Sequence, residues 1–360
     1  PDHSGFWYTQ HSPKGKKYIK ISLPDANKED LFNHELLAKS LSDVLDKEII
    51  STDLPIQQII YKSPTELNFR IKGDSYALDT KDYSLKKQTK SSERNTKEIL
   101  SPNKEWIAYA ENHNLYIKST KDSSVKQLST AGKKNYEYAS YYGWYDIIEG
   151  ENGERPEYFR MEWSKDNKWI STDIVDLRTA EKMHLLDWSI DSLHRPKLLS
   201  YYRGSPGDTT MVYFEPVFFN LESGKEIKVD LPRSTHINSI NKEWSIDPSK
   251  VYLEFTSRGF QNKAIYKFHL DTEELETIYS ETSDTNIDTF THQLAEESGY
   301  LFFLSEKSGW RQLYSVDLKT KKEKAITNGS YYINNIVHID EAKQQIYFLA
   351  SGKEAGRNPY

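Results

Sequence analysis

The stretch that decides the fold is residues 299–329, GYLFFLSEKSGWRQLYSVDLKTKKEKAITNG. Residues 300–304 form an apolar, aromatic run of strand length, which a Ser-Gly pair interrupts. Residues 310–316 then alternate large and polar side chains with a period of two, and a polar turn separates them from a short strand at 323–327. With a preceding strand at 290–294, the pattern predicts a four-stranded antiparallel meander. Such a sheet cannot bury both of its faces alone, so it requires neighbours of the same kind.

The same order of strands and turns recurs elsewhere in the chain. The second strand of each repeat is expected to start at one of five positions: Trp106, Trp169, Val251, Leu301 and Ile346. These positions lie roughly 45 to 80 residues apart, a period typical of propeller blades that carry insertions. Four-stranded repeats joined by Ser-x-Asp-type turns are the sequence signature of a β-propeller. We therefore predict an all-β protein, in which residues 1–360 form one β-propeller domain of four-stranded antiparallel blades.

Three segments depart from this repeat. Residues 30–45 are expected to form one amphipathic helix, because the leucines fall on one stripe and the lysine and aspartate residues on the other face. This helix is expected to pack on the outside or rim of the ring. Residues 133–159 and 190–210 are expected to be insertions between strands. Long loops in a regular array usually lie on one face, which is often the binding face.

Composition limits the classes of function. The chain has 360 residues, no cysteine, 25 tyrosines, 8 tryptophans and a formal net charge of −6. Aromatic side chains suit pleated, half-buried surfaces, which fits an all-β protein. The lack of cysteine excludes a disulfide framework and a thiolate metal site. The negative charge argues against a nucleic-acid partner, and no apolar run reaches the length of a membrane span.

Motifs of known catalytic machinery are missing from the sequence. It contains no Gly-x-Ser-x-Gly nucleophile elbow, no GxGxxG or GKS/T phosphate loop and no HExxH zinc motif. The histidines occur singly, and His184 is expected to be a core or cross-strand residue. Asp166, Asp247 and Asp317 lie in repeat turns, where aspartate side chains bond nearby backbone N–H groups. We therefore expect no catalytic residue, no cofactor and no metal site in these residues.

The best local candidate for a ligand site is an acidic group in the first insertion. It comprises Asp146, Glu149, Glu151 and Glu154, among six tyrosines and one tryptophan. Carboxylates on an aromatic loop can hold a cationic group by charge-assisted hydrogen bonds while the rings exclude water. The alternative is a solvated loop whose acids pair with Arg155 and Arg160, since most surface ion pairs have no special role.

Several segments, in this order and spacing, resemble one known family. They are FWY at 6–8 with LFNHELLA at 31–38, SPNKEWIA at 101–108 with NLY at 114–116, WSKDNKW at 163–169, RPKLLSYY at 195–202 with PGD at 206–208, SGWRQLY at 308–314, and ASGKEAGRNPY at 350–360. Together they resemble the N-terminal β-propeller of dipeptidyl peptidase IV-like serine peptidases, in the prolyl oligopeptidase family. The resemblance covers essentially the whole chain.

This resemblance implies an eight-bladed propeller that caps a C-terminal α/β-hydrolase domain, whose Ser, Asp and His triad is expected beyond Tyr360. In the family the propeller limits access to short peptides, and acidic residues on a blade insertion bind the free N-terminus of the substrate. In this chain those residues are expected to be Glu149, Glu151 and Glu154. The adjacent Glu-Glu pair of the family is absent. Removal of dipeptides, removal of longer pieces and cleavage of internal bonds therefore all stay open.

The resemblance further implies that the parent protein is a serine-type dipeptidyl peptidase or oligopeptidase. Its substrate is expected to be a peptide, its location periplasmic or exported, and a homodimer is one expected assembly. The alternative is a free-standing propeller that serves as a scaffold for protein or glycan binding. The last repeat supplies only two strands, at 336–339 and 346–350. We therefore expect an incomplete ring, with residues 344–350 at or near a free edge.

Overall fold

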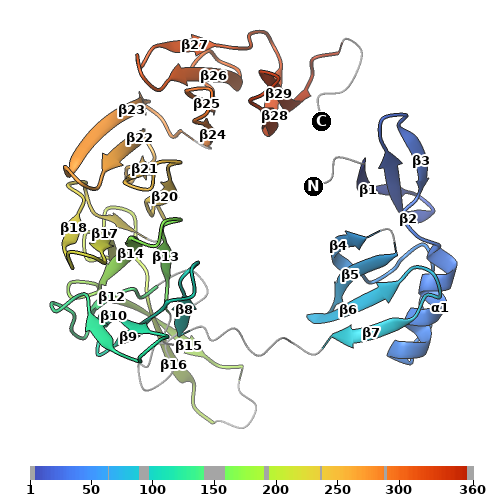
Figure 1. The fold of residues 1–360 in the computed structure, drawn as a ribbon, viewed down its shortest axis with the longest axis horizontal. Helices are drawn as coiled ribbons and strands as arrows, with labels where there is room; N and C mark the ends of the chain where they lie inside the picture. The colour runs from blue at the N-terminus through green and yellow to red at the C-terminus, as the bar shows by residue number, and fades with distance from the viewer. Residues whose placement is uncertain are drawn as a thin grey trace. The chain divides into compact units, whose positions relative to one another are not determined.

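The computed structural model describes residues 5–63, 65–88, 97–141, 159–189, 194–235, 237–287 and 290–354. In this part of the chain the regular elements are antiparallel β-strands and a single helix, α1 (Figure 1). The chain divides into two compact units, Pro1–Asn95 and Thr96–Tyr360. No helix among the described residues is long and apolar enough to cross a membrane. The predicted all-β class with four-stranded antiparallel sheets is confirmed, whereas the number of blades and the closure of the ring stay predictions.

The smaller unit consists of two sheets and the helix. The first sheet has the order β1 (Gly5–Ser12), β2 (Gly15–Ser22) and β3 (Asn27–Asp30). The second sheet has the order β4 (Gln57–Ser63), β5 (Glu66–Ile71), β6 (Asp74–Asp79) and β7 (Leu85–Gln88). Helix α1 (His34–Leu45) and both sheets contribute to one core, in which Leu37, Leu41 and Leu67 are almost completely buried.

Helix α1 begins at His34 and not at residue 30, so the predicted boundary was wrong. Asp30 is instead the last residue of β3, where pairing with β2 keeps the backbone extended. Asn33 then caps the helix, because its Oδ1 accepts hydrogen bonds from the N–H groups of Glu35 and Leu36, both at 3.0 Å. Leu31 and Phe32, between β3 and the helix, are also buried and extend the apolar stripe towards the N-terminus, which is why the periodicity alone placed the start too early.

The larger unit contains a series of antiparallel sheets (Figure 1). The first has β8 (Glu98–Leu100), β9 (Trp106–Glu111), β10 (Asn114–Ser119) and β11 (Val125–Gln127) in chain order. The second has β12 (Tyr136–Tyr138) and β13 (Met161–Trp163) on β14 (Trp169–Asp176), and β14 on β17 (Tyr213–Asn220). On its other side β17 pairs with β18 (Glu226–Lys228) and β19 (Ser234–Thr235).

Two further four-stranded sheets and a strand pair complete this unit. The third sheet has β20 (Asn241–Trp244), β21 (Lys250–Thr256), β22 (Asn262–His269) and β23 (Glu274–Thr282) in chain order. The fourth has β24 (Thr291–Ala295), β25 (Tyr300–Ser305), β26 (Gln312–Asp317) and β27 (Glu323–Ala325). The final pair is β28 (Tyr332–Asp340) with β29 (Gln345–Ser351). Among the described strands β29 pairs only with β28, and the predicted relation of this edge to a closed ring stays untested.

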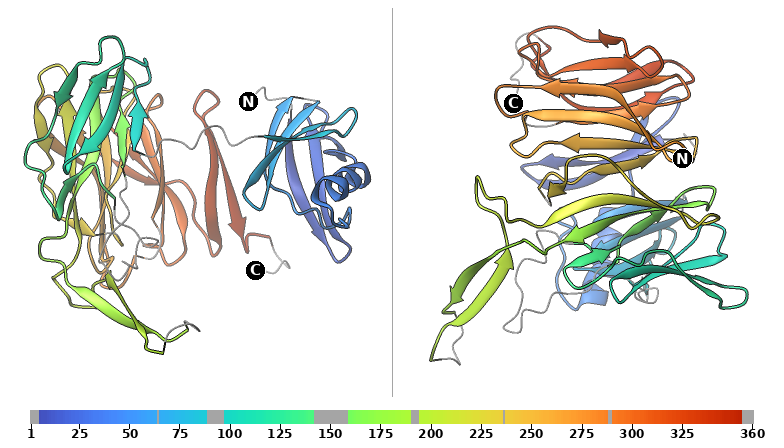
Figure 2. Two further views of the ribbon diagram at one scale, coloured as in Figure 1. Left: turned by 90° about the horizontal axis from the view of Figure 1, so that it is seen from below. Right: turned by 90° about the vertical axis from the view of Figure 1, so that its left-hand side faces the viewer.

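A separate hairpin leaves the second sheet between β14 and β17. Its strands are β15 (Lys182–Asp187) and β16 (Lys197–Tyr202), and Figure 2 shows them extending away from the other sheets of this unit. Residues 183–186 belong to β15, which pairs with β16, while β17 occupies the place beside β14. The excursion from this sheet therefore begins with β15, before the insertion predicted at residues 190–210. His184 is exposed and pairs with Ser200, which confirms a cross-strand position and excludes a core one.

Sheets in the larger unit bury both of their faces. Phe218 and Phe219 are consecutive on β17, and each is fully buried, but in different clusters on the two sides of the sheet. Phe302 and Phe303 divide in the same way on β25. Consecutive side chains of a strand point to opposite faces. A strand between two neighbouring sheets therefore reads as a continuous apolar run, as residues 300–304 do.

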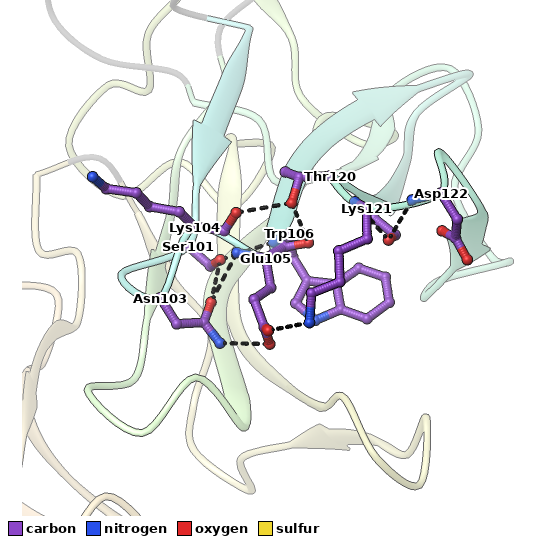
Figure 3. Close-up of polar contacts among 9 residues, drawn as sticks. Ser101, Asn103, Lys104, Glu105, Trp106, Thr120, Lys121 and Asp122 are labelled. Atoms are coloured by element: carbon purple, nitrogen blue, oxygen red, sulfur yellow. Dashed lines mark hydrogen bonds and ion pairs between the residues drawn. The ribbon is translucent and has the colours of Figure 1, made fainter.

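Short polar turns connect the first two strands of these sheets (Figure 3). In the first sheet Ser101 Oγ accepts a hydrogen bond from the N–H of Trp106 at 3.0 Å and donates one to Asn103 Oδ1 at 2.7 Å. The second sheet repeats the arrangement, since Ser164 Oγ donates to Asp166 Oδ1 at 2.6 Å. These side chains satisfy backbone and hydroxyl donors that the turn would otherwise leave unpaired.

Asp166, Asp247 and Asp317 have the structural role that the sequence predicted. Each accepts a hydrogen bond from the backbone N–H two residues further along. Hydrogen bonds from the side chains of Lys250 and Ser249 lower the pKa of Asp247 to about 2. The carboxylates therefore stabilise turns in their ionised form.

Carboxylates also connect the turns of neighbouring sheets. Glu296 follows β24 and accepts three hydrogen bonds from the third sheet: from Ser245 Oγ and the N–H of Ile246, both at 2.7 Å, and from Tyr252 Oη at 2.8 Å. Glu341 follows β28 and repeats the contact one sheet further, accepting from the N–H of Ser298 at 2.8 Å and from its Oγ at 2.7 Å. A recurring carboxylate thus fixes each of these turns to the next sheet.

We predict that Glu296→Gln lowers the free energy of unfolding of the chain by about 2 kcal/mol, because charge-assisted hydrogen bonds of a partly buried carboxylate are lost. Urea unfolding followed by circular dichroism measures this change. The matched control is Glu297→Gln at the adjacent exposed position, which should change stability by less than about 0.5 kcal/mol. Equal effects of the two substitutions would contradict a special role of Glu296.

Candidate functional site

The predicted acidic residues Asp146, Glu149, Glu151 and Glu154 lie outside the described residues. The two ends of the insertion that carries them are described, and both attach to β14. Strand β12 lies near the start of the predicted insertion and β13 follows it, and each pairs with β14. The N–H of Arg160 donates to the carbonyl oxygen of Ala139 at 2.9 Å, so the chain leaves and returns at one place.

A cavity of about 470 Å³ lies at this place in the larger unit. Tyr141 and Arg160, at the two ends of the insertion, form part of its wall. The remaining wall comes from strands β13, β14 and β17 of the second sheet, β20 and β21 of the third sheet with residues 239–240 before them, and β24 of the fourth. Three consecutive sheets therefore contribute polar side chains to a single cavity.

Lys242 and Asp173 form a fixed ion pair in the wall. Lys242 Nζ lies 2.6 Å from Asp173 Oδ1 and also donates to the carbonyl oxygen of Thr172 at 3.2 Å. Both side chains are largely buried. This pair joins β20 to β14 and leaves neither charge free for a ligand.

His292 lies between two carboxylates. Its Nδ1 is 3.7 Å from Glu254 Oε2 and its Nε2 is 3.9 Å from Glu243 Oε2. Glu254 Oε2 also accepts a hydrogen bond from Asn241 Nδ2 at 3.0 Å. Packing against Phe290, with ring centroids 5.7 Å apart, fixes the imidazole further. The imidazole is thus held in place, and Glu254 already has a hydrogen-bond donor.

Glu243 differs from Asp173 and Glu254. Its side chain keeps 56% of its surface exposed, and the Nε2 of His292 lies 3.9 Å from its Oε2, beyond normal hydrogen-bond length. Surrounding protein displaces part of its hydration shell, and together with the Glu296 charge this raises the pKa of Glu243, against an opposing effect of His292. A concave wall can partly desolvate a group that solvent still reaches. Glu243 therefore carries an incompletely neutralised charge.

Two more polar groups border the cavity. The guanidinium of Arg160 lies over the ring of Tyr141, 5.3 Å from its centroid, and not beside a carboxylate in the described residues. The predicted alternative, in which the acids of the insertion pair with Arg155 and Arg160, stays a prediction because those acids lie outside the described residues. Ser171 is 1% exposed, and its Oγ has no hydrogen-bond partner in the described part of the chain.

The wall can bind charged groups, but its described residues do not form a metal centre. Groups of three or more His, Asp or Glu residues that could hold a metal ion do not occur among the described residues. Glu243, Glu254 and His292 were not among the residues predicted from the sequence. Glu243 and Glu254 lie on β20 and β21 of the third sheet, and His292 lies on β24 of the fourth. The only feature of the sequence that could have indicated them is a polar residue within a predicted strand.

The larger unit is therefore an all-β domain of packed antiparallel sheets with a cavity lined by charged side chains. The sequence pattern of the family described as the dipeptidyl peptidase IV (DPP IV) N-terminal region matches residues 55–360. The chain belongs to this family, as the resemblance implied.

Similar solved structures agree in fold. The chain is similar to dipeptidyl peptidase 4 from Porphyromonas gingivalis, with 15% identity and a TM-score of 0.56 over 98% of this chain and 49% of that one. It is also similar to a dipeptidyl aminopeptidase IV candidate from Bacteroides ovatus, with 14% identity and a TM-score of 0.54 over 97% and 49%. The chain thus spans about half the length of these relatives. None of the curated proteins matches the sequence.

We predict that Glu243→Gln raises the thermal stability of the chain at neutral pH, by less than about 1 kcal/mol because the group is half-exposed. A carboxyl whose pKa is raised on folding destabilises the folded state once it is ionised in both states. This penalty is complete above the folded-state pKa and disappears as pH falls to the unfolded value of about 4.3. The gain of the variant should therefore vanish near pH 4.

Melting temperatures of the wild type and of the variant between pH 4 and pH 8 measure this effect. Glu162→Gln is the control, because Glu162 borders the same cavity and is exposed. It should shift stability by less than about 0.5 kcal/mol at any of these pH values. A Glu243→Gln variant that is less stable than the wild type at neutral pH would contradict the assignment of an incompletely neutralised charge.

Proposed function

We propose that this chain is the non-catalytic, eight-bladed propeller domain of a dipeptidyl peptidase IV-like serine exopeptidase. It gates access to the active site and anchors the N-terminus of a peptide for cleavage by a C-terminal α/β-hydrolase domain. The observation that carries the proposal is the family match over residues 55–360, on a fold shared with dipeptidyl peptidase structures of about twice the length. We further propose that the protein acts in the periplasm or outside the cell.

The position of the acidic insertion supports the anchoring role. Both of its ends border the charged cavity, through Tyr141 and Arg160. Carboxylates that enter a partly desolvated, aromatic environment bind an ammonium group more strongly than they do in water. We propose that Glu149, Glu151 and Glu154 supply this contact, and that the catalytic triad belongs to the hydrolase domain.

We predict that Glu151→Gln or Glu154→Gln, in the protein that includes the hydrolase domain, lowers kcat/KM about ten- to hundredfold for peptides with a free N-terminus. One charge-assisted hydrogen bond to an ammonium group is worth about 1.5–3 kcal/mol, which corresponds to this range. N-acetylated peptides of the same sequence should show little change. Chromogenic peptide hydrolysis at several substrate concentrations measures both series.

Equal losses on free and acetylated peptides would indicate a folding defect and would remove these residues from the proposed site. The hydrolase itself has a simpler test. The gene segment after the codon for Tyr360 should encode a Gly-x-Ser-x-Gly motif. A stop codon there would favour the alternative of a free-standing binding scaffold.

Exposed apolar side chains support a homodimer as the assembly. Five of them gather on or beside the β15–β16 hairpin: Met183, Leu185, Leu186, Trp188 and Leu198. An isolated two-stranded hairpin is marginally stable in water, and contiguous exposed apolar residues mark interaction sites. We propose that the hairpins of two copies cover each other, since a second copy supplies the same apolar surface.

We predict that replacing both Leu186 and Trp188 by serine weakens self-association at least tenfold, because two large apolar side chains no longer leave water on assembly. Sedimentation velocity over a concentration series measures the association. Leu100→Ser is the control, since Leu100 is also about half exposed but lies on β8. A wild-type chain that stays monomeric at all concentrations would contradict the dimer.

A further inference from the structure

We propose that the cavity contains a second peptide-contacting site, in which Glu243 binds the cationic side chain of a lysine or arginine residue. Glu254 and His292 form the wall behind it. The site differs from the acidic insertion in residues and in the group that it recognises. The inference rests on the proposed function in one respect, namely that the ligand is a peptide.

Glu243 has unused capacity for a ligand, unlike Asp173 and Glu254. Asp173 is engaged by Lys242 at 2.6 Å. Glu254 receives the Asn241 amide at 3.0 Å. Glu243 has only the distant His292 imidazole at 3.9 Å, and more than half of its side chain is open to solvent. A carboxylate accepts several hydrogen bonds at once, so an entering ammonium or guanidinium group would find free acceptor positions.

The charge of the described part of the wall favours a cation. Among the described residues, four carboxylates and two permanent cations line the cavity: Glu162, Asp173, Glu243 and Glu254 against Arg160 and Lys242. With His292 neutral, they leave a formal excess of two negative charges. The wall comes from strands of three sheets, so the groups are held by backbone pairing and need little reordering to bind.

Ser171 supplies an independent sign that the cavity binds a ligand. Ser171 lines the same cavity and is only 1% exposed. Its Oγ has no hydrogen-bond partner in the described residues. A buried hydroxyl without a partner costs about 1–3 kcal/mol. A turn of the Ser171 side chain toward the cavity would let an N–H or carbonyl group of a bound peptide satisfy its hydroxyl, while the side chain of the peptide reaches Glu243.

An anionic ligand is less well supported. Lys242 is already neutralised by Asp173, so only Arg160 could bind a carboxylate. Arg160 lies over Tyr141, and a single stacked guanidinium at the rim would have to overcome the negative excess of the remaining wall. Selectivity between basic and acidic peptides therefore separates the two interpretations directly.

The test measures binding of capped peptides to the 360-residue chain by isothermal titration calorimetry at low ionic strength. The peptides are N-acetyl-Ala-Ala-Xaa-Ala-amide, with lysine, arginine, glutamine or glutamate at Xaa. Capping removes both terminal charges, so the proposed N-terminal anchor does not contribute. The lysine and arginine peptides should bind about three- to tenfold more tightly than the glutamine peptide, a range reduced from that of a fully buried pair because Glu243 is half-exposed.

Glu243→Gln should abolish this preference, because it removes the charge and keeps the shape. Glu162→Gln is the matched control and should retain most of the preference. Unchanged circular dichroism spectra of both variants exclude misfolding as the cause. Equal binding of lysine and glutamine peptides, including no measurable binding of either, would overturn the inference, as would tightest binding of the glutamate peptide. Failure here leaves the N-terminal anchor intact, since that role is tested by free against acetylated substrates.

Discussion

The larger unit depends on one constraint, namely that a four-stranded sheet with two apolar faces must be covered on both sides. Phe302 and Phe303 illustrate it, since these neighbours enter clusters on opposite sides of β25. Burying each large side chain contributes about 1.5–3 kcal/mol. A sheet alone would expose half of these groups, so the sheets can only be stable as a series. The constraint also explains the recurring carboxylates, because a turn between stacked sheets has polar groups that need a partner from the next sheet.

The cavity follows from the same stacking. An interior strand has a hydrogen-bonded partner strand on each side and apolar neighbours on both faces. The first strand of a sheet, such as β20 or β24, has a partner strand on one side only. Lys242, Glu243 and His292 all lie on such first strands. Polar side chains are tolerated there because solvent reaches Glu243, while the largely buried Lys242 and His292 lie beside carboxylates. Successive sheets then bring these side chains together, which is how β14, β20 and β24 create a charged wall although they are far apart in sequence.

Local features were predictable from the sequence, and features that depend on register were not. The strands around residues 300–316 and the aspartate turns at 166, 247 and 317 follow from side-chain alternation and from hydrogen bonds between near neighbours. The Glu243–His292–Glu254 arrangement could not be predicted, because it depends on how two sheets are placed against each other. The start of the excursion at β15 was not predicted, for a different reason. An apolar strand of an exposed hairpin has the same pattern as a strand of a buried sheet, so only the pairing of β14 with β17 distinguishes the two.

A carboxylate that costs stability needs a reason to be where it is. Packing does not require a charge at Glu243, since glutamine has almost the same shape, and the pKa of the group is raised by the surrounding protein. Asp173 and Glu254, by contrast, have partners that hold strands together, and their charges serve the fold. Sites that bind charged ligands commonly hold their groups partly desolvated before the ligand arrives, because the attraction is then stronger. Within one cavity the fold thus satisfies Asp173 and Glu254 with its own groups and leaves Glu243 open to a cation that it does not supply.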